Sequence, residues 1–201
     1  MIPFTTLAAQ CAPESAPTTM AAIVRVESRG NPLAMYDNNT GQEITPPNLP
    51  QAVTWLRAAI ALGQRVDVGI AQVDTENFTA YGLTPENAFD PCTNLSVGAK
   101  ILLSDYRKAV TRYGPGQIAL YHAFQAYNSG HLIGDPGYAN RILAAAGIPV
   151  SVQQHGVIYR LIHHYHDPFT YHWKTSSGES VHVDMRYRGS ASGLSLTHKW
   201  G

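Results

Sequence analysis

Glu27 is the residue of this 201-residue sequence whose surroundings most favour acid–base chemistry. The apolar residues Met20, Ile23 and Val24 precede it at helical spacing, and Gly30 follows it as a helix stop. Glu27 is therefore expected in the last turn of a helix, where burial and the helix dipole both raise the pKa of a carboxyl group. A rise from about 4.3 to about 6 costs about 2.3 kcal/mol and gives a group able to donate a proton near neutral pH. The alternative is a solvated glutamate at a helix end.

Two further segments follow Glu27 in a set order. Residues 69–72 read Gly-Ile-Ala-Gln inside a short apolar run, and residues 126–128 read Ala-Tyr-Asn at the end of a predicted helix. The three segments together resemble the catalytic core of soluble, goose-lysozyme-like lytic transglycosylases, which carry Glu-Ser followed by Asn-Pro, then Gly-Leu-Met-Gln, then Ala-Tyr-Asn. Here the first motif is Glu27-Ser28 followed by Asn31-Pro32, and the second has two aliphatic substitutions. Each motif is weak alone, but three in order over about a hundred residues are specific.

The resemblance covers residues 11 to about 148 and implies both a fold and a set of site residues. The fold is mainly α, of the α+β lysozyme-like kind, with two lobes and a substrate cleft. Glu27 would be the catalytic residue, and the residues expected to bind or position substrate are Ser28, Gln72, Tyr127 and Asn128. Without the resemblance, these four residues would be a polar helix end, a solvated glutamine, a core aromatic and a helix C-cap.

The resemblance also implies a reaction in which one carboxyl group acts as acid and then as base. Glu27 would protonate the glycosidic oxygen between N-acetylmuramic acid and N-acetylglucosamine, and would then accept the proton of the muramic acid C6 hydroxyl group. The product would be a 1,6-anhydro sugar, formed without water and without a cofactor. Most glycosidases use two carboxylates instead. Candidates for a second one are suggested only by nearness in sequence: Asp37, Glu43, Asp67 and Asp74.

Three other functions are compatible with parts of this pattern. The first is a hydrolysing lysozyme (muramidase) on the same fold, which needs a positioned water molecule. The second is a non-catalytic peptidoglycan-binding or assembly module, and the intact Glu27, Gln72 and Tyr127-Asn128 argue against it. The third is a component of a secretion machine that works mainly through protein contacts.

The composition excludes several classes of partner. The chain carries 14 Lys and Arg against 14 Asp and Glu, so no net charge attracts nucleic acid or an anionic membrane. No apolar run is long enough to span a bilayer. Residues 1–10 are apolar but lack the basic start of a full signal peptide, so either a signal has been trimmed or this start is native.

The two cysteines, Cys11 and Cys92, are either unrelated buried thiols or a bonded pair. The segments Cys11-Ala12-Pro13 and Asp90-Pro91-Cys92 resemble the paired cysteine segments of transglycosylases that belong to type IV secretion systems. The resemblance implies a disulfide that closes about 80 residues, worth about 4–5 kcal/mol in the chain-entropy model. Such a bond needs an oxidising compartment, so we expect a periplasmic protein that acts on peptidoglycan strands beside type IV secretion or conjugation components.

The expected elements divide the chain into a lead-in at 1–15 held by Cys11, a transglycosylase domain at 16–149 and a His-rich appendage of unknown role at 150–201. The ranges expected as helices are 16–28, 50–62, 91–113, 118–127, 137–146 and 157–165, with a short helix after Asp74. We expect a loop at 29–50 and a strand or loop at 66–73. Residues 170–174 and 181–187 alternate in polarity around a Ser-Ser-Gly turn, which predicts a β-hairpin.

Residues 155–201 hold seven of the nine histidines, which raises the question of a metal site. One interpretation is a zinc site built from His163, His164, His166, His182 and Asp184. Because their spacing follows no established ligand pattern, we expect a solvated, His-rich appendage and no metal.

Overall fold

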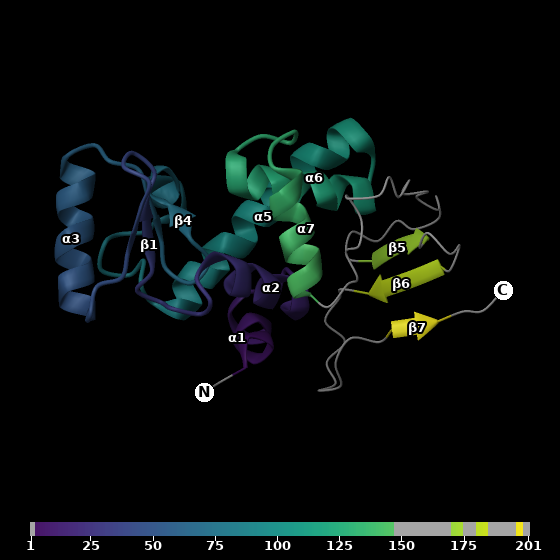
Figure 1. Cartoon of the computed structure of the whole chain (residues 1–201), viewed down its shortest axis with the longest axis horizontal. Coiled ribbons are helices and arrows are strands. Elements are labelled where there is room, and N and C mark those ends of the chain that lie inside the picture. The colour runs from purple at the N-terminus through teal and green to yellow at the C-terminus, as the bar shows by residue number, and fades with distance from the viewer. Residues whose placement is uncertain (1–2, 147–169, 175–179, 185–195, 199–201) are drawn as a thin grey trace.

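The computed structural model describes residues 3–146, 170–174, 180–184 and 196–198 (Figure 1). In chain order its elements are α1 Phe4–Cys11, α2 Pro17–Glu27, β1 Met35–Asp37, β2 Gln42–Ile44, α3 Leu49–Ala61, β3 Val66–Val68, β4 Val73–Asp74, a 3-10 helix Thr75–Asn77, α4 Phe78–Tyr81, α5 Pro91–Tyr113, α6 Gln117–Ser129, α7 Pro136–Ala145, β5 Thr170–Lys174, β6 Ser180–Asp184 and β7 Leu196–His198. The fold is mainly helical with small antiparallel sheets, as the sequence predicts. No helix in these ranges combines the length and hydropathy needed to cross a membrane.

Four helices, α2, α3, α5 and α7, carry a proline in the first turn. Pro17 and Pro91 stand at the start of α2 and α5, where a backbone N–H would have no helical partner. Asp90 caps α5 by accepting a hydrogen bond from the Thr93 N–H at 2.8 Å. The pair Asp135-Pro136 starts α7 in the same way. These local signals explain why the helix starts agree with the sequence prediction.

The apolar stripe of α2 lies in the core. Met20, Ile23 and Val24 are fully buried, where α2 packs against α1 on one side and α7 on the other (Figure 1). The 23-residue α5 packs against both α1 and α6. Because the buried side of α2 packs against α1 and α7, the core fixes the position of its last residue, Glu27.

The strands β1 to β4 form an antiparallel sheet in the order β2-β1-β3-β4, next to α3 (Figure 1). Side chains alternate between the two faces of a strand, so the register defines two rows across the sheet. The apolar row consists of Ile44, Met35, Val68 and Val73. The polar row consists of Glu43, Tyr36, Asp67 and Asp74. One face of the sheet therefore packs against the core, and the other face carries ionisable side chains.

The structure differs from the sequence prediction in two segments. The range 29–50, expected to be a loop, contains β1 and β2, because strands of three residues are too short to show a period. The lead-in expected at 1–15 contains α1, whose residues Ala8 and Cys11 are buried in the core. Helix α1 has no side-chain cap, so the usual start signal is missing from its sequence.

The remaining predicted core elements are found within a few residues of their expected bounds. In the appendage, β5 pairs antiparallel with β6, which confirms the hairpin, and β7 adds a third strand that was not predicted. The helix expected at 157–165 lies outside the described residues, as do His163, His164 and His166. So do residues 185–187 of the expected second strand.

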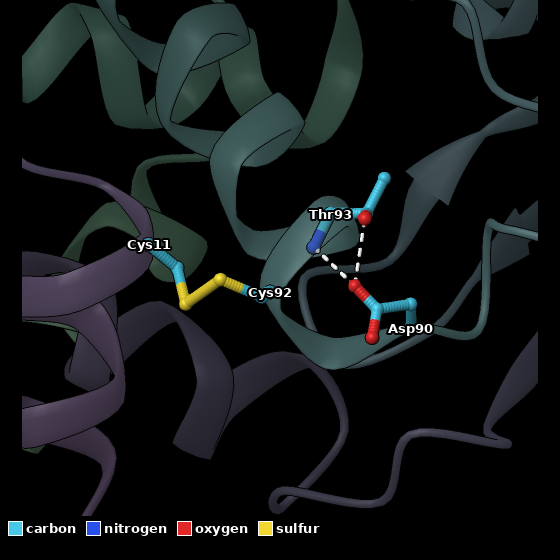
Figure 2. The surroundings of a disulfide bond; sticks show 4 residues. All are labelled: Cys11, Asp90, Cys92 and Thr93. Carbon is cyan, nitrogen blue, oxygen red and sulfur yellow. Dashed lines mark hydrogen bonds between the residues drawn. A yellow bond between two sulfur atoms is a disulfide. The ribbon is translucent and has the colours of Figure 1, made fainter.

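A disulfide joins Cys11 to Cys92 (Figure 2). Cys11 ends α1, and Cys92 lies in the first turn of α5, beside the cap formed by Asp90 and Thr93. The predicted pairing is thus confirmed. The bond ties α1 to the central helix across a sequence separation of 81 residues.

We expect the protein expressed in the periplasm to contain no free thiol, and mass spectrometry before and after reduction measures this directly. Replacing both Cys11 and Cys92 with serine should lower the free energy of unfolding by about 4 kcal/mol, because the unfolded chain loses a long covalent loop. Urea unfolding of the double variant and of the oxidised protein gives the difference. Two free thiols in periplasmic material would contradict the pairing.

Candidate active site

Glu27 is the last residue of α2, and its carboxylate is held by a tyrosine from another helix. The hydroxyl group of Tyr138 in α7 donates a hydrogen bond to Oε1 of Glu27. Directly after Glu27 the chain turns sharply, since Arg29 and Gly30 both have positive φ angles, of 54° and 84°. Glu27 therefore lies at the end of α2, just before the segment that connects this helix to the β-sheet.

Burial raises the pKa of Glu27 to about 7. The negative charge of Asp67 contributes to this rise, whereas the hydrogen bond from Tyr138 and the positive charge of Arg141 oppose it, and a pKa of about 7 is the net result. The direction agrees with the sequence prediction, and burial is the main physical cause. A carboxyl group that is about half protonated near pH 7 can both donate and accept a proton.

Tyr138 and Arg141 are site residues to which the sequence assigned no role. Tyr138 is 1% exposed, and the guanidinium of Arg141, one turn further along α7, lies 5.5 Å from the centre of its ring. Burial and the charge of Glu27 both raise the pKa of Tyr138 well above its usual value, so its hydroxyl group remains a donor. The start of α7 reads Tyr-x-x-Arg and resembles the closing helix of the transglycosylases, which was the available signal.

The turn between β3 and β4, residues 69–72, is held by side chains from three helices. The Ser28 hydroxyl at the end of α2 donates to the Ile70 carbonyl at 2.8 Å. The Tyr127 hydroxyl in α6 donates to the Ala71 carbonyl at 2.7 Å. Two of the predicted site residues, Ser28 and Tyr127, therefore hold the backbone of the second motif and do not bond the carboxylate directly.

Asn94 in α5 is the third of these side chains, and it is fully buried. Its Oδ1 accepts from the Ala71 N–H at 2.8 Å, and its Nδ2 donates to the carbonyls of Val68 at 2.8 Å and Ala88 at 2.9 Å. Gly69, with φ of 80°, leaves room for it, because a Cβ there would lie 2.5 Å from Nδ2. The Asn94 amide and the backbone groups around it thus all have hydrogen-bond partners, which keeps the turn rigid.

The turn presents Gln72 in a fixed orientation. Gln72 has a φ of 49°, which is uncommon outside glycine and is maintained here by the surrounding contacts. Its Nε2 donates to the carbonyls of Gly69 at 2.8 Å and Ala34 at 3.0 Å. Since both amide protons are used, Oε1 is the group left to accept a hydrogen bond from a ligand.

Tyr127 and Asn128 lie near the end of α6 but face different surroundings. The hydroxyl group of Tyr127 donates to the Ala71 carbonyl, and the hydrogen bond to Glu27 comes from Tyr138. The charges of Glu27 and Asp67 still raise the pKa of Tyr127, after burial, so its ring lies near both carboxylates. Asn128 is exposed, and Gly130 forms the C-cap of α6. The cap role for Asn128 is therefore wrong, and a substrate contact stays a prediction.

Four carboxylates were candidates for a partner of Glu27, and Asp67 is the one whose charge acts on it. Asp37 is buried and accepts from the N–H groups of Asn39 and Thr40 in the β1–β2 turn. Asp74 is ion-paired with Arg65 at 2.7 Å, and Glu43 is exposed on the edge strand β2. Within the described ranges, no group of three or more His, Cys, Asp or Glu side chains is arranged to hold a metal ion.

Residues 4–135 match the family described as the transglycosylase SLT domain. The chain belongs to this family. The match spans α1 through α6 and so includes the disulfide, Glu27, the turn with Gln72, and Tyr127-Asn128. Helix α7, which supplies Tyr138, lies just beyond it.

The chain is similar to virB1 proteins of other bacteria, one of which is named for a type IV secretion system. The type IV secretion system protein virB1 of Brucella suis is 41% identical over 163 residues, which is 76% of this chain and 68% of that protein. The protein virB1 of Agrobacterium fabrum is 42% identical over 137 residues, or 68% of this chain and 55% of that protein. The chain thus spans between about half and two thirds of the length of these relatives. No solved structure matches the chain.

Proposed function

We propose that this chain is a lytic transglycosylase that cleaves the β-1,4 bond between N-acetylmuramic acid and N-acetylglucosamine in peptidoglycan and leaves a 1,6-anhydro end. The observation that carries the proposal is Glu27 itself. It is a partly buried carboxyl group with a pKa of about 7, held by Tyr138 beside the motif turn of a transglycosylase SLT domain.

In the first step, protonated Glu27 donates its proton to the glycosidic oxygen. The bond between this oxygen and C1 of the muramic acid breaks, and its electron pair stays on the oxygen, which becomes the 4-hydroxyl group of N-acetylglucosamine. C1 is left with oxocarbenium character. In the second step, the C6 hydroxyl oxygen of the same sugar bonds to C1, and its proton passes to the Glu27 carboxylate. The residue ends as it began, and the nucleophile is intramolecular, which favours its attack.

The other site residues divide into two roles under this proposal. Gln72 accepts a hydrogen bond from the glycan through Oε1, and the exposed Asn128 contacts it from α6. Ser28 and Tyr127 hold the Ile70 and Ala71 carbonyls, and so hold Gln72 in place. Tyr138 fixes the orientation of the carboxyl group that moves the proton.

The same proposal includes a place of action beside a type IV secretion apparatus in the periplasm. The Brucella and Agrobacterium relatives are virB1 proteins, and the Brucella suis relative is named as a type IV secretion system protein. The Cys11–Cys92 disulfide supports an oxidising compartment, because such bonds are rare in the cytosol. Local opening of the peptidoglycan for the apparatus is the expected role.

Incubation of the protein with purified murein sacculi, followed by mass analysis of the released muropeptides, tests the proposal. Products with 1,6-anhydro ends are expected. Reducing ends would show a hydrolysing lysozyme, which Asp67 makes the nearest alternative because it supplies a second carboxylate. No products would show a binding or assembly module. Either of the last two results rejects the proposal.

We also propose that residues 16–149 form the catalytic domain and that residues 150–201 are not needed for cleavage. Within the part of the chain that the structure describes, the side chains placed around Glu27 come from residues before 146. A chain ending after Pro149 should retain its far-ultraviolet circular dichroism in the helical region and should cleave sacculi within about twofold of the full chain, a change too small to reflect a lost catalytic group. If truncation removes activity while the helical signal stays unchanged, the appendage is part of the site and the domain boundary is wrong.

A further inference from the structure

Asp67 lies in the polar row of the sheet, on the face opposite the apolar row. Its Cα is paired with Tyr36 on β1 and with Asp74 on β4, so the row continues on both sides of it. Asp67 is more deeply buried than Glu43 and Tyr36 of the same row, which are exposed. The middle of this face therefore carries a partly buried carboxylate.

Among the described residues Asp67 makes no direct ion pair, although the charge of Arg65 acts on it and lowers its pKa by less than burial raises it. The Asn38 side chain donates to its Oδ2 at 3.1 Å through Nδ2. The nearby guanidinium of Arg65 pairs with Asp74 at 2.7 Å and with Glu76 at 3.1 Å. In the parts of the chain that the structure describes, Asp67 forms no ion pair, and a partly buried carboxylate without one is unfavourable unless it has a use.

The charge of Asp67 acts toward Glu27 and not only within the sheet. It raises the pKa of Glu27, and together with Glu27 it raises that of Tyr127. The hydrogen bonds give the geometry: Ser28, next to Glu27, and Tyr127 in α6 both donate to carbonyls of the turn that directly follows β3. Burial raises the pKa of Asp67 itself to about 6, below the value of about 7 for Glu27.

We propose that Asp67 is the second charged residue of the reaction: a carboxylate on the sheet that stabilises positive charge on the sugar ring while Glu27 holds the proton to be donated. This rests on the proposed function. Preorganised charge aimed at a developing opposite charge is among the largest contributions to catalysis. Asn38 is the positioning residue that orients Asp67, because its amide bonds the carboxylate from the β1–β2 turn.

The groups that face Glu27 set the expected pH dependence. Tyr138 and Arg141 from α7 lower its pKa, and Asp67 from β3 raises it. Tyr127 from α6 stays neutral, because its own pKa is raised well above its usual value. When the charge of Asp67 is removed, Tyr138 and Arg141 still lower the pKa of Glu27. Glu27 should therefore lose its proton at lower pH.

The test is the Asp67→Asn variant, which keeps the size of the side chain. The rate of muropeptide release should fall about 10- to 100-fold, and the alkaline limb of the rate profile should move to lower pH. Carbon-13 NMR of the glutamate carboxyl groups should show Glu27 titrating at lower pH. The control is Glu43→Gln, in the same row but exposed, which should change neither the rate nor the titration.

The outcomes separate this inference from the proposed function. An Asp67→Asn variant with an unchanged rate and an unchanged Glu27 titration overturns the role of Asp67, while loss of activity in Glu27→Gln still supports the transglycosylase. Reducing-end products from the unaltered enzyme overturn both, since Asp67 would then serve a hydrolysis.

A second variant covers the case in which Asp67→Asn fails to fold. Asn38→Ala keeps the carboxylate but removes the hydrogen bond that lowers its pKa. Asp67 should then ionise at higher pH, and the acidic limb of the rate profile should move up with it. An unchanged acidic limb in a folded Asn38→Ala protein would overturn the proposal.

Discussion

Glu27→Gln should reduce the release of 1,6-anhydromuropeptides by at least about 10⁴-fold, while the protein stays folded. A general acid–base residue contributes about 10²–10⁴-fold, and here one residue serves both proton transfers. Glutamine keeps the size of the side chain and can still accept the hydrogen bond from Tyr138, but it can neither donate nor take up the catalytic proton. Product masses from murein sacculi measure the effect. A variant with the rate of the unaltered protein would reject the transglycosylase.

The matched controls are Asp74→Asn and Glu43→Gln, which should each retain most of the activity. The side chain of Asp74 is committed to Arg65 and to the cap of the following 3-10 helix, and asparagine preserves that cap. If either residue proves as essential as Glu27, and the products carry reducing ends, the enzyme is a two-carboxylate lysozyme.

Glu27→Gln should also stabilise the protein above neutral pH. The folded-state pKa of Glu27 is raised from its ordinary 4.5 to about 7, so the unfolded chain gives up this proton more readily than the native state. Ionisation therefore disfavours the folded protein progressively as the pH rises from about 4.5 to about 7, by on the order of 3 kcal/mol. Urea unfolding of both proteins at pH 4 and pH 8 measures the sign, and the gain for the variant should appear only at the higher pH.

Asn94→Ala should lower the free energy of unfolding by about 3–5 kcal/mol. The change removes three hydrogen bonds and leaves the Ala71 N–H and the carbonyls of Val68 and Ala88 buried without their partner, each at a cost of about 1–3 kcal/mol that is not fully additive. The turn that orients Gln72 should loosen at the same time. Activity measured well below the unfolding transition should therefore fall as well, although Asn94 itself contacts no substrate.

The control for this variant is Asn77→Ala, because the Asn77 side chain makes no hydrogen bond within the described part of the chain. It should change the stability by less than about 1 kcal/mol, as a typical substitution away from buried networks does. If Asn94→Ala were equally mild, Ser28 and Tyr127 alone would suffice to hold the turn.

The sequence by itself determined the family and the long helices, and it singled out Glu27 as the candidate acid. Proline and aspartate at helix starts are local signals, and they placed α5 and α7 to within a residue or two. The position of Glu27 at a helix end, after an apolar stripe, was enough to predict the direction of its pKa shift. Strands of two or three residues and the uncapped α1 left no such signal, because short elements owe their form to tertiary packing.

Only the tertiary structure decided which side chains meet. Tyr138 lies 111 residues after Glu27, and no period or spacing indicates that it, and not Tyr127, bonds the carboxylate. Likewise Asp67 was one of four equal candidates until the fold brought it to where its charge acts on Glu27, while Asp74 is paired with Arg65. The physical reason is common to both. Local sequence determines helix ends and faces, whereas the partners of a buried polar group depend on which elements the core brings together.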